Sequence, residues 1–239
     1  MVQLRATRLV RTVKQLPRTI FIGTTLKISV DNRPILSYAQ MLFNWRAWRA
    51  IYYTRVWQSG KTVHAGGPAY DGEVVCLDGV TRRLLHFQRG RRPLVLIFGS
   101  CTWPPFMAAL DSLCRMAADS AHLADFVVVY IEEAHPTDGW AFPGNHEISQ
   151  HRTLEDRLAA AARLNDWSLP DNMTVVVDSM SDELNGAYGG LYDRLYVIHN
   201  GRVEYQGQRG PAGFRPGEVA SWLRKYEDEL NISSSSSSH

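Results

Sequence analysis

The chain of 239 residues, with 45% hydrophobic and 21% charged residues, has room for one globular domain and an additional arm, and this composition excludes a fully disordered or fibrous protein. Three cysteines are too few for a disulfide scaffold, which favours a reducing compartment, and no run of 18 apolar residues predicts a transmembrane helix. The net charge of +2 is unevenly distributed, because residues 1–60 carry a net +9 and the remainder a net −7.

Residues 1–62 are predicted to form a basic N-terminal arm with one amphipathic helix. Apolar residues recur there at helical spacing, namely Leu36, Met41, Leu42, Trp45, Trp48, Ile51 and Tyr52. Arginines flank this stripe, as in helices that lie on a membrane surface, although such a stripe more commonly packs against the body or a partner chain. The body lacks aromatic residues interleaved with basic ones, so nucleic acid is not an expected partner.

Strand and helix patterns alternate over residues 63–230, which are predicted to form one α/β domain. Apolar runs predict strands at 73–77, 94–98, 126–131 and 173–177. Helices are predicted at 104–119, opened by two prolines, and at 153–165, opened by a capping box of Thr153 and Asp156.

The C-terminal part is predicted to contain a hairpin, a helix and a tail. The hairpin joins 195–198 to 202–205 through an Asn-Gly turn. The helix covers 217–230, and a Ser-rich tail of low complexity covers 231–239.

This order of elements predicts a mixed sheet with helices on both faces. Three strands joined through helices indicate a parallel centre, and the hairpin adds antiparallel strands. It is the order of a thioredoxin-like domain with an extra N-terminal strand and a long insertion after the second core strand. Arg194 stands where thioredoxins have a cis-proline, which favours a peroxiredoxin-like variant.

The turn after the strand at 94–98 is the first place to expect chemistry. Ligands of such sheets bind beyond the carboxyl ends of the strands, and a helix N-terminus stabilises a thiolate. Cys101 lies in this turn, directly before the helix at 104–119, but no Cys-x-x-Cys pattern is present. A simple dithiol–disulfide oxidoreductase is therefore disfavoured.

Six segments of the chain have uncommon sequences. The first is RPLVLIFGSCTWPPFM at 92–107, and the others are YIEEAHPTDGW at 130–140, QHRTLEDR at 150–157, AYG at 187–189, RLYV at 194–197 and YQGQRGP at 205–211. Together they resemble the iodothyronine deiodinases, selenoenzymes that remove iodine from thyroid hormones. The sequences at 150–157 and 205–211 are most similar to those of the type 3, inner-ring branch. The resemblance extends over about residues 64–230.

Trp103 stands where this family carries selenocysteine. Indole has no nucleophilic chalcogen and cannot attack iodine. Because UGA encodes selenocysteine, a reading of UGA as tryptophan gives this residue, and a true substitution is the other possibility. The resemblance implies a selenolate at position 103 that takes iodine from an aryl ring, and a thiol co-substrate of thioredoxin, glutaredoxin or glutathione type that regenerates it.

The resemblance also implies roles for residues around position 103. Cys101 would be a resolving or relay thiol, unless it is a small buried hydrophobic residue. His135 would be a proton donor or relay. A hydrogen-bonded proton path would continue through Ser100, Thr102 and Tyr130.

Three further residues would bind the hormone. His151 and Arg209 match clamp positions of the family, and Asp193 stands where relatives have Glu and would accept from the substrate amine. The resemblance implies a homodimer, association with a membrane with the catalytic domain facing the cytosol, and neither a bound cofactor nor a metal.

Two other functions stay open at this point. A genuine Trp103 would give a catalytically inactive protein that binds thyroid hormone. A peroxiredoxin-like thiol oxidoreductase would work through Cys101, although a second active-site thiol is missing.

Overall fold

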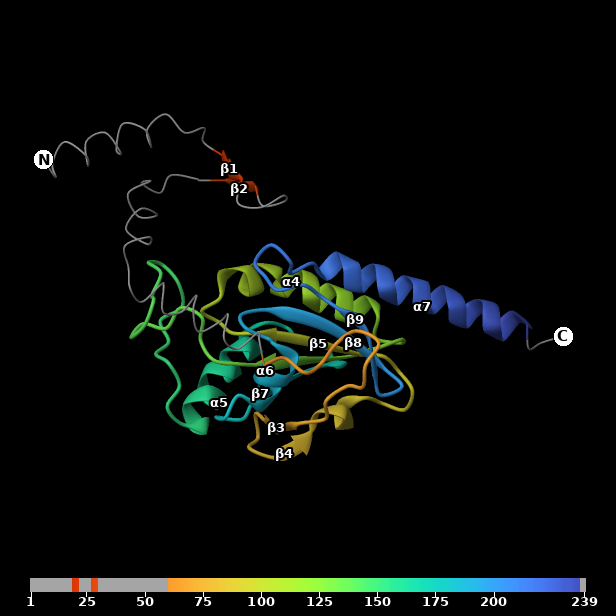
Figure 1. Cartoon of the computed structure of the whole chain (residues 1–239), viewed down its shortest axis with the longest axis horizontal. Coiled ribbons are helices and arrows are strands. Elements are labelled where there is room, and N and C mark those ends of the chain that lie inside the picture. The colour runs from red at the N-terminus through yellow and green to blue at the C-terminus, as the bar shows by residue number, and fades with distance from the viewer. Residues whose placement is uncertain (1–18, 22–26, 30–59, 237–239) are drawn as a thin grey trace, which may run out of the picture. The chain divides into compact units, whose positions relative to one another are not determined.

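The structure, a computed structural model, describes residues 19–21, 27–29 and 60–236 (Figure 1). Contacts along the chain divide it into two units, residues 1–52 and 53–239, each of which is described by itself. In the first unit, β1 (Thr19–Phe21) and β2 (Lys27–Ser29) pair antiparallel. The amphipathic helix predicted around Trp45 and Trp48 lies outside the described residues, so the arm stays a prediction.

The second unit is built on a seven-stranded mixed sheet with the order β4-β3-β7-β6-β5-β8-β9. Its strands are β3 (Glu73–Cys76), β4 (Thr81–Arg83), β5 (Leu94–Gly99), β6 (Asp125–Tyr130), β7 (Met173–Asp178), β8 (Arg194–His199) and β9 (Arg202–Gln206). The central strands β5, β6 and β7 are parallel, and all other pairs are antiparallel. The predicted mixed sheet with a parallel centre is confirmed.

Alternate residues of the buried strands face two separate cores. Val95 and Ile97 of β5 pack under α4 (Pro104–Asp119), α5 (Leu154–Ala162) and α7 (Pro216–Ser236). Leu94, Leu96 and Phe98 face the other side, with the short helix α6 (Glu183–Tyr188) and the 3-10 helix η1 (Leu84–Phe87). Each fully buried aliphatic side chain contributes about 1.5–3 kcal/mol, so helices are held on both faces.

Two predicted helix starts and the predicted hairpin turn are present in the structure. The helix α4 begins at Pro104, and the capping box of α5 forms between Thr153 and Asp156. At the tip of the β8–β9 hairpin, Asn200 and Gly201 have φ of 50° and 72°, the positive values that this tight turn requires.

In the second unit, several helix ends and three short elements differ from the prediction. The helix α5 ends at Ala162 and continues as a 3-10 turn, η2 (Arg163–Asp166), and α7 runs to Ser236 instead of ending at Leu230. The elements β4, η1 and α6 were not predicted. The three residues of β4 are exposed, so no apolar alternation indicates that strand.

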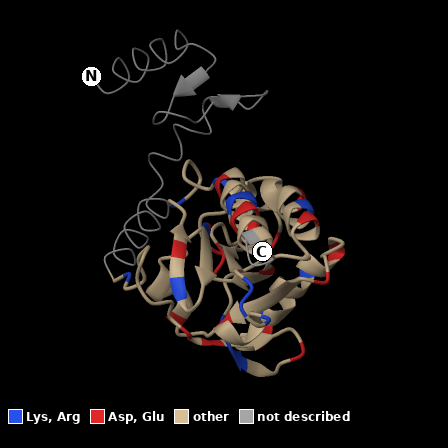
Figure 2. Ribbon diagram, turned by 90° about the vertical axis from the view of Figure 1, so that its right-hand side faces the viewer, with Lys and Arg blue, Asp and Glu red and all other residues tan. Residues whose placement is uncertain are grey.

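Charged residues of both signs are interspersed over the strands, helices and loops of the second unit (Figure 2). Among the helices that the structure describes, none combines the length and the apolar character needed to cross a bilayer.

Candidate active site

The turn that joins β5 to α4 is held by the end of β6 and by the loop that follows it. Cys101 N donates to the Tyr130 hydroxyl at 3.1 Å, and Thr102 N donates to Glu133 Oε2 at 3.0 Å. The Thr102 hydroxyl also donates to Glu133 Oε2, while Asn145 Nδ2 donates to Thr102 O at 2.7 Å. The carboxyl ends of two neighbouring parallel strands thus fix the conformation of the turn.

Glu133 is the centre of this network. Its side chain is fully buried, and besides Thr102 it accepts hydrogen bonds from the Tyr130 hydroxyl and from His151 Nε2, the latter at 3.1 Å. Burial by itself would raise the pKa of Glu133, but the hydrogen bonds from His151, Thr102 and Tyr130 together hold that pKa below its usual value. Glu133 is therefore an ionised carboxylate inside the protein.

The tautomer of His151 follows from its two partners. Arg157 Nε donates to His151 Nδ1 at 3.4 Å, so Nδ1 accepts and the proton is on Nε2, which donates to Glu133. Arg157 is itself anchored by Asp182 at 2.9 Å. Because His151 is only 7% exposed, its observed contacts make it part of the Glu133 network, and its predicted substrate-binding role stays a prediction.

His135 lies beside this network and is neutral. Its ring nitrogen Nδ1 donates to the Trp140 carbonyl at 2.9 Å, and its backbone N–H donates to the Thr102 hydroxyl at 3.1 Å. Burial lowers the pKa of His135 to about 4, although the bond to Trp140 opposes this shift. The other nitrogen, Nε2, therefore has a free lone pair, and it is buried without a hydrogen-bond partner among the described residues.

Trp103 ends the turn as the N-terminal cap residue of α4 and packs into an aromatic cluster. Its indole lies 5.4 Å from the His135 ring, at an interplanar angle of 24°, and 5.3 Å from the Tyr192 ring, at 33°. The His135 ring is also contacted at its edge by Trp140 and Phe142, at 4.8 and 4.0 Å between centroids.

Asp193, which directly precedes β8, is buried beside the same indole. Within the described part of the chain, neither carboxylate oxygen makes a hydrogen bond of normal geometry, and neither does Trp103 Nε1. Burial raises the pKa of Asp193 to about 6, and the nearby Trp103 N–H, the Gly210 amide and the Arg209 guanidinium limit the rise. Of the three predicted clamp residues, Asp193 and Arg209 thus lie on the side of Trp103, whereas His151 lies in the Glu133 network.

Cys101 and Ser100 point into the protein. Cys101 is fully buried, with Sγ 3.8 Å from the Ala160 carbonyl oxygen, and burial raises its pKa to about 11. It therefore has the environment of a buried apolar residue, and its predicted resolving role stays a prediction. Ser100 Oγ is buried without a hydrogen-bond partner among the described residues.

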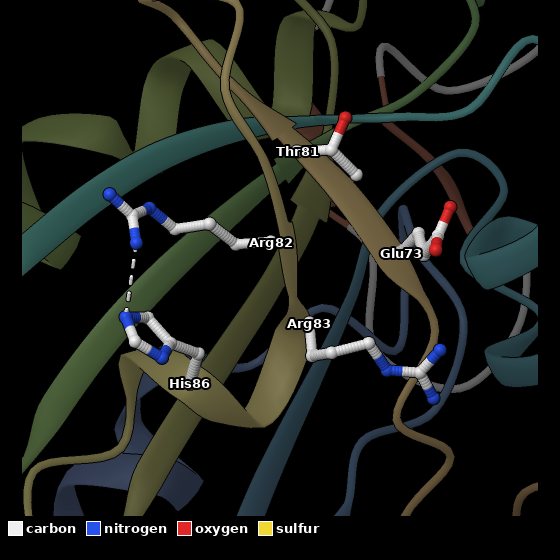
Figure 3. A pocket seen from close by; sticks show the side chains of 5 residues that line it. All are labelled: Glu73, Thr81, Arg82, Arg83 and His86. Carbon is white, nitrogen blue, oxygen red and sulfur yellow. Dashed lines mark hydrogen bonds between the residues drawn. The ribbon is translucent and has the colours of Figure 1, made fainter.

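A surface hollow of about 310 Å³ lies at the edge of the sheet, over β3, β4 and η1 (Figure 3). It is lined by Glu73, Thr81, Arg82, Arg83 and His86, with a 3.3 Å contact between Arg82 and His86. None of the predicted site residues lines it. Within residues 19–21, 27–29 and 60–236, no group of three His, Cys, Asp or Glu is arranged to hold a metal ion.

Sequence reasoning brought together most of this site but missed some of its members. Ser100, Cys101, Thr102, Trp103, Tyr130 and His135 lie around one turn. Glu133, Tyr192, Trp140 and Arg157 were not among the predicted site residues. Tyr192 directly precedes the predicted clamp residue Asp193, which is the one signal that pointed to it.

Comparisons with known proteins agree on one family. A family model described as iodothyronine deiodinase matches residues 8–227. A thyroxine 5-deiodinase of Gallus gallus is 44% identical over 203 residues, which cover 84% of this chain and 78% of that protein. A thyroxine 5-deiodinase of Bos taurus is 43% identical over 185 residues, 77% of this chain, and the chain spans only 61% of its length.

A solved structure supports the fold. The thiol peroxidase from Chromobacterium violaceum aligns with a TM-score of 0.51 at 13% identity, over 71% of this chain and 91% of that one. At this identity the similarity shows the fold alone, and the predicted thioredoxin-like fold of peroxiredoxin type is confirmed.

Proposed function

The chain belongs to the iodothyronine deiodinase family, and on that premise we propose that it catalyses the reductive removal of iodine from iodothyronines, with a preference for the inner ring. The observation that carries the proposal is the arrangement at the β5–α4 turn. Position 103 lies there at a helix N-terminus, next to a neutral histidine with a free nitrogen lone pair and above a buried, ionised glutamate.

The overall reaction consumes an aryl iodide and two thiols, and it yields the deiodinated aryl ring, a disulfide, iodide and a proton. A chalcogen at position 103 would supply the nucleophile that takes iodine from the ring. The positive end of the helix α4 favours an anion at its N-terminal cap. We therefore propose that residue 103 is selenocysteine in the active protein and that the indole of Trp103 stands in its place.

His135 acts in this proposal as a proton relay. At neutral pH the ring is unprotonated, because its pKa is about 4, and the free Nε2 lone pair can therefore take up a proton transiently during transfer. The proton is then delivered to the ring carbon that has lost iodine, so that the carbon–iodine bond is replaced by a carbon–hydrogen bond. The Nδ1–H bond to the Trp140 carbonyl keeps the ring in the one tautomer that leaves Nε2 free.

Glu133 and its partners are positioning residues in this proposal. Thr102 connects the carboxylate to the His135 backbone, and Tyr130 connects it to the Cys101 backbone. A negative charge at this depth stabilises positive charge that develops on His135 during proton transfer. Arg209 and Asp193 lie where they can bind polar groups of the substrate beside position 103.

The remaining parts of the proposal rest on the family. An external thiol of thioredoxin, glutaredoxin or glutathione type is the reductant, two copies of the chain form a homodimer, and the protein associates with a membrane with its catalytic domain in the cytosol. Sedimentation at several protein concentrations tests the dimer, and flotation of the full chain with vesicles of 30% anionic lipid tests the membrane contact.

The activity is tested by iodide release from labelled thyroxine in the presence of a dithiol. The variant Trp103→Cys is expected to release iodide from the inner ring, and Trp103→Ala, which removes the indole without adding a nucleophile, is the matched control. Mass spectrometry of the native peptide around position 103 identifies the natural residue. Absence of release by Trp103→Cys together with a genuine tryptophan in the native peptide would overturn the proposal.

The alternative function through Cys101 is disfavoured by the structure. A peroxide-reducing thiol must be an accessible thiolate, whereas the Cys101 side chain is fully buried and its pKa is raised to about 11.

A further inference from the structure

The indole of Trp103 lies on a platform made of two other rings. The planes of His135 and Tyr192 are inclined by only 26°, with 6.4 Å between their centroids. The indole is inclined by 24° and 33° to these rings and is almost equally distant from both. Such near-parallel, offset arrangements are the favourable geometry for aromatic contacts. The platform, His135 and Tyr192, would accept any flat ring of similar size.

The polar end of the indole lies beside a buried acceptor. The Asp193 carboxylate is completely buried, and its oxygens make no hydrogen bond of normal geometry to the described residues, while the indole N–H lies close enough to influence its protonation. A buried carboxylate without a donor is costly, so an acceptor of this kind is expected to have a donor in its functional state.

Gly210 shapes the wall behind Asp193. A Cβ atom at position 210 would lie 1.7 Å from Asp193 Oδ1, so only glycine allows the carboxylate to keep this place. The Gly210 backbone therefore packs closely against the acceptor, on the side of Trp103 where the indole N–H lies.

We propose that the Trp103 indole occupies the place at which the substrate's iodinated aryl ring binds, stacked on His135 and Tyr192, with a hydrogen-bond donor of the substrate facing Asp193. This inference rests on the proposed function and names the subsite of its substrate ring. Tyr192 is then a specificity-determining residue. In the chain with Trp103, the indole fills this subsite and blocks it. A smaller residue at position 103 leaves the subsite open, and a ring bound there lies next to the side chain of that smaller residue.

Binding of a small probe tests the subsite without any catalysis. The probe is 3,5-diiodophenol, and 3,5-diiodoanisole is the same ring without the donor. Titrations followed by ligand-observed NMR compare the intact chain with Trp103→Ala, which is expected to bind the phenol at least tenfold more tightly. Near-UV circular dichroism verifies that the variant is folded, and Trp103→Val, which keeps part of the apolar volume, is a second variant.

The matched control is Trp222→Ala. Trp222 is also a partly buried indole stacked on a tyrosine, Tyr226, at 5.4 Å and 13°, but it lies in α7. This variant is expected to bind no better than the intact chain. In the Trp103→Ala background, Tyr192→Leu is expected to reverse most of the gain, and Asp193→Asn to reduce the preference for the phenol over the anisole.

Two results would overturn the inference. One is equal affinity of the intact chain and of folded Trp103→Ala or Trp103→Val for the phenol. The other is an equal gain in Trp222→Ala. The outcome is separable from that of the proposed function, because a tighter phenol complex of Trp103→Ala combined with no iodide release by Trp103→Cys would contradict the reaction and leave the subsite standing.

Discussion

Replacing Glu133 with glutamine tests whether the buried carboxylate is the element that holds the active-site turn. Four donors converge on its two oxygens, from Thr102 N, the Thr102 hydroxyl, the Tyr130 hydroxyl and His151 Nε2. A carboxamide has one oxygen and one NH2 group. In one orientation its NH2 group faces His151 Nε2–H, and in the other it faces the Thr102 backbone N–H. Neither of these donors can become an acceptor. A backbone N–H can only donate, and Arg157 fixes the tautomer of His151.

The magnitude follows from these contacts. One orphaned buried N–H costs about 1–3 kcal/mol, and hydrogen bonds to a charged acceptor are about twice as strong as neutral ones. Loss of both effects in the buried His151–Glu133 hydrogen bond is expected to lower the free energy of unfolding by about 3 kcal/mol. Equilibrium unfolding in urea at pH 7, followed by far-UV circular dichroism, measures this difference.

The neighbouring Glu132 provides a matched control. Burial raises the pKa of Glu132 to about 8, so at pH 7 this side chain is mostly a neutral acid, with Oε2 accepting from Gln150 Nε2 at 3.2 Å. Glutamine preserves both the neutrality and an acceptor oxygen, and Glu132→Gln is expected to change the free energy of unfolding by less than about 1 kcal/mol. Equal losses in the two variants, or a loss below about 1 kcal/mol in Glu133→Gln, would refute the reasoning.

Two further predictions concern pH and packing. The raised pKa of Glu132 contributes stability that is fully present below about pH 4.5 and is lost as the pH rises toward 8. The lowered pKa of His135, about 4, makes stability rise with pH, but only below about pH 6.5. Stability is therefore expected to fall by about 1.5 kcal/mol between pH 6.5 and 8, and urea titrations should show that Glu132→Gln removes this slope; an unchanged slope would contradict the assignment. Gly210→Ala is expected to lower the free energy of unfolding by about 2–3 kcal/mol in thermal or urea unfolding, because its Cβ would collide with the Asp193 carboxylate. Gly217→Ala, with open space around position 217, should lower it by less than about 0.5 kcal/mol. Equal losses in the two variants would show that Asp193 can move aside.

The sequence predicted those parts of the fold that depend on local patterns. Continuous apolar runs gave β5, β6 and β7, and the Thr153–Asp156 pair gave the start of α5, because burial on both faces and capping leave direct marks in the sequence. The exposed edge strand β4 has no such mark. The end of α7 was predicted too early because the serine run was assigned to a tail of low complexity, whereas the helix continues through this run to Ser236.

The candidate site was predictable up to the neighbourhood of residue 103. Resemblance to a family identified the turn and His135, but it could not give the direction in which each side chain points. His151 lies in the protein interior because Arg157, from one helix further along the chain, and Glu133 take both of its nitrogens. Tyr192 belongs to the site because its ring contacts the Trp103 indole, and this contact between rings appears only in the three-dimensional structure.

The attachment of the β5–α4 turn to the loop after β6 bears on how residue 103 could be reduced after the proposed reaction. Local unwinding of this turn would be needed for a second thiol of the same chain to reach it. Here the amides of Cys101 and Thr102 are tied to Tyr130 and Glu133, and the Thr102 carbonyl is tied to Asn145. Local unwinding would have to break these bonds together, and slow hydrogen–deuterium exchange at both amides is the expected signature. In the proposed reaction, an intact turn is expected to leave the reduction of residue 103 to an external thiol.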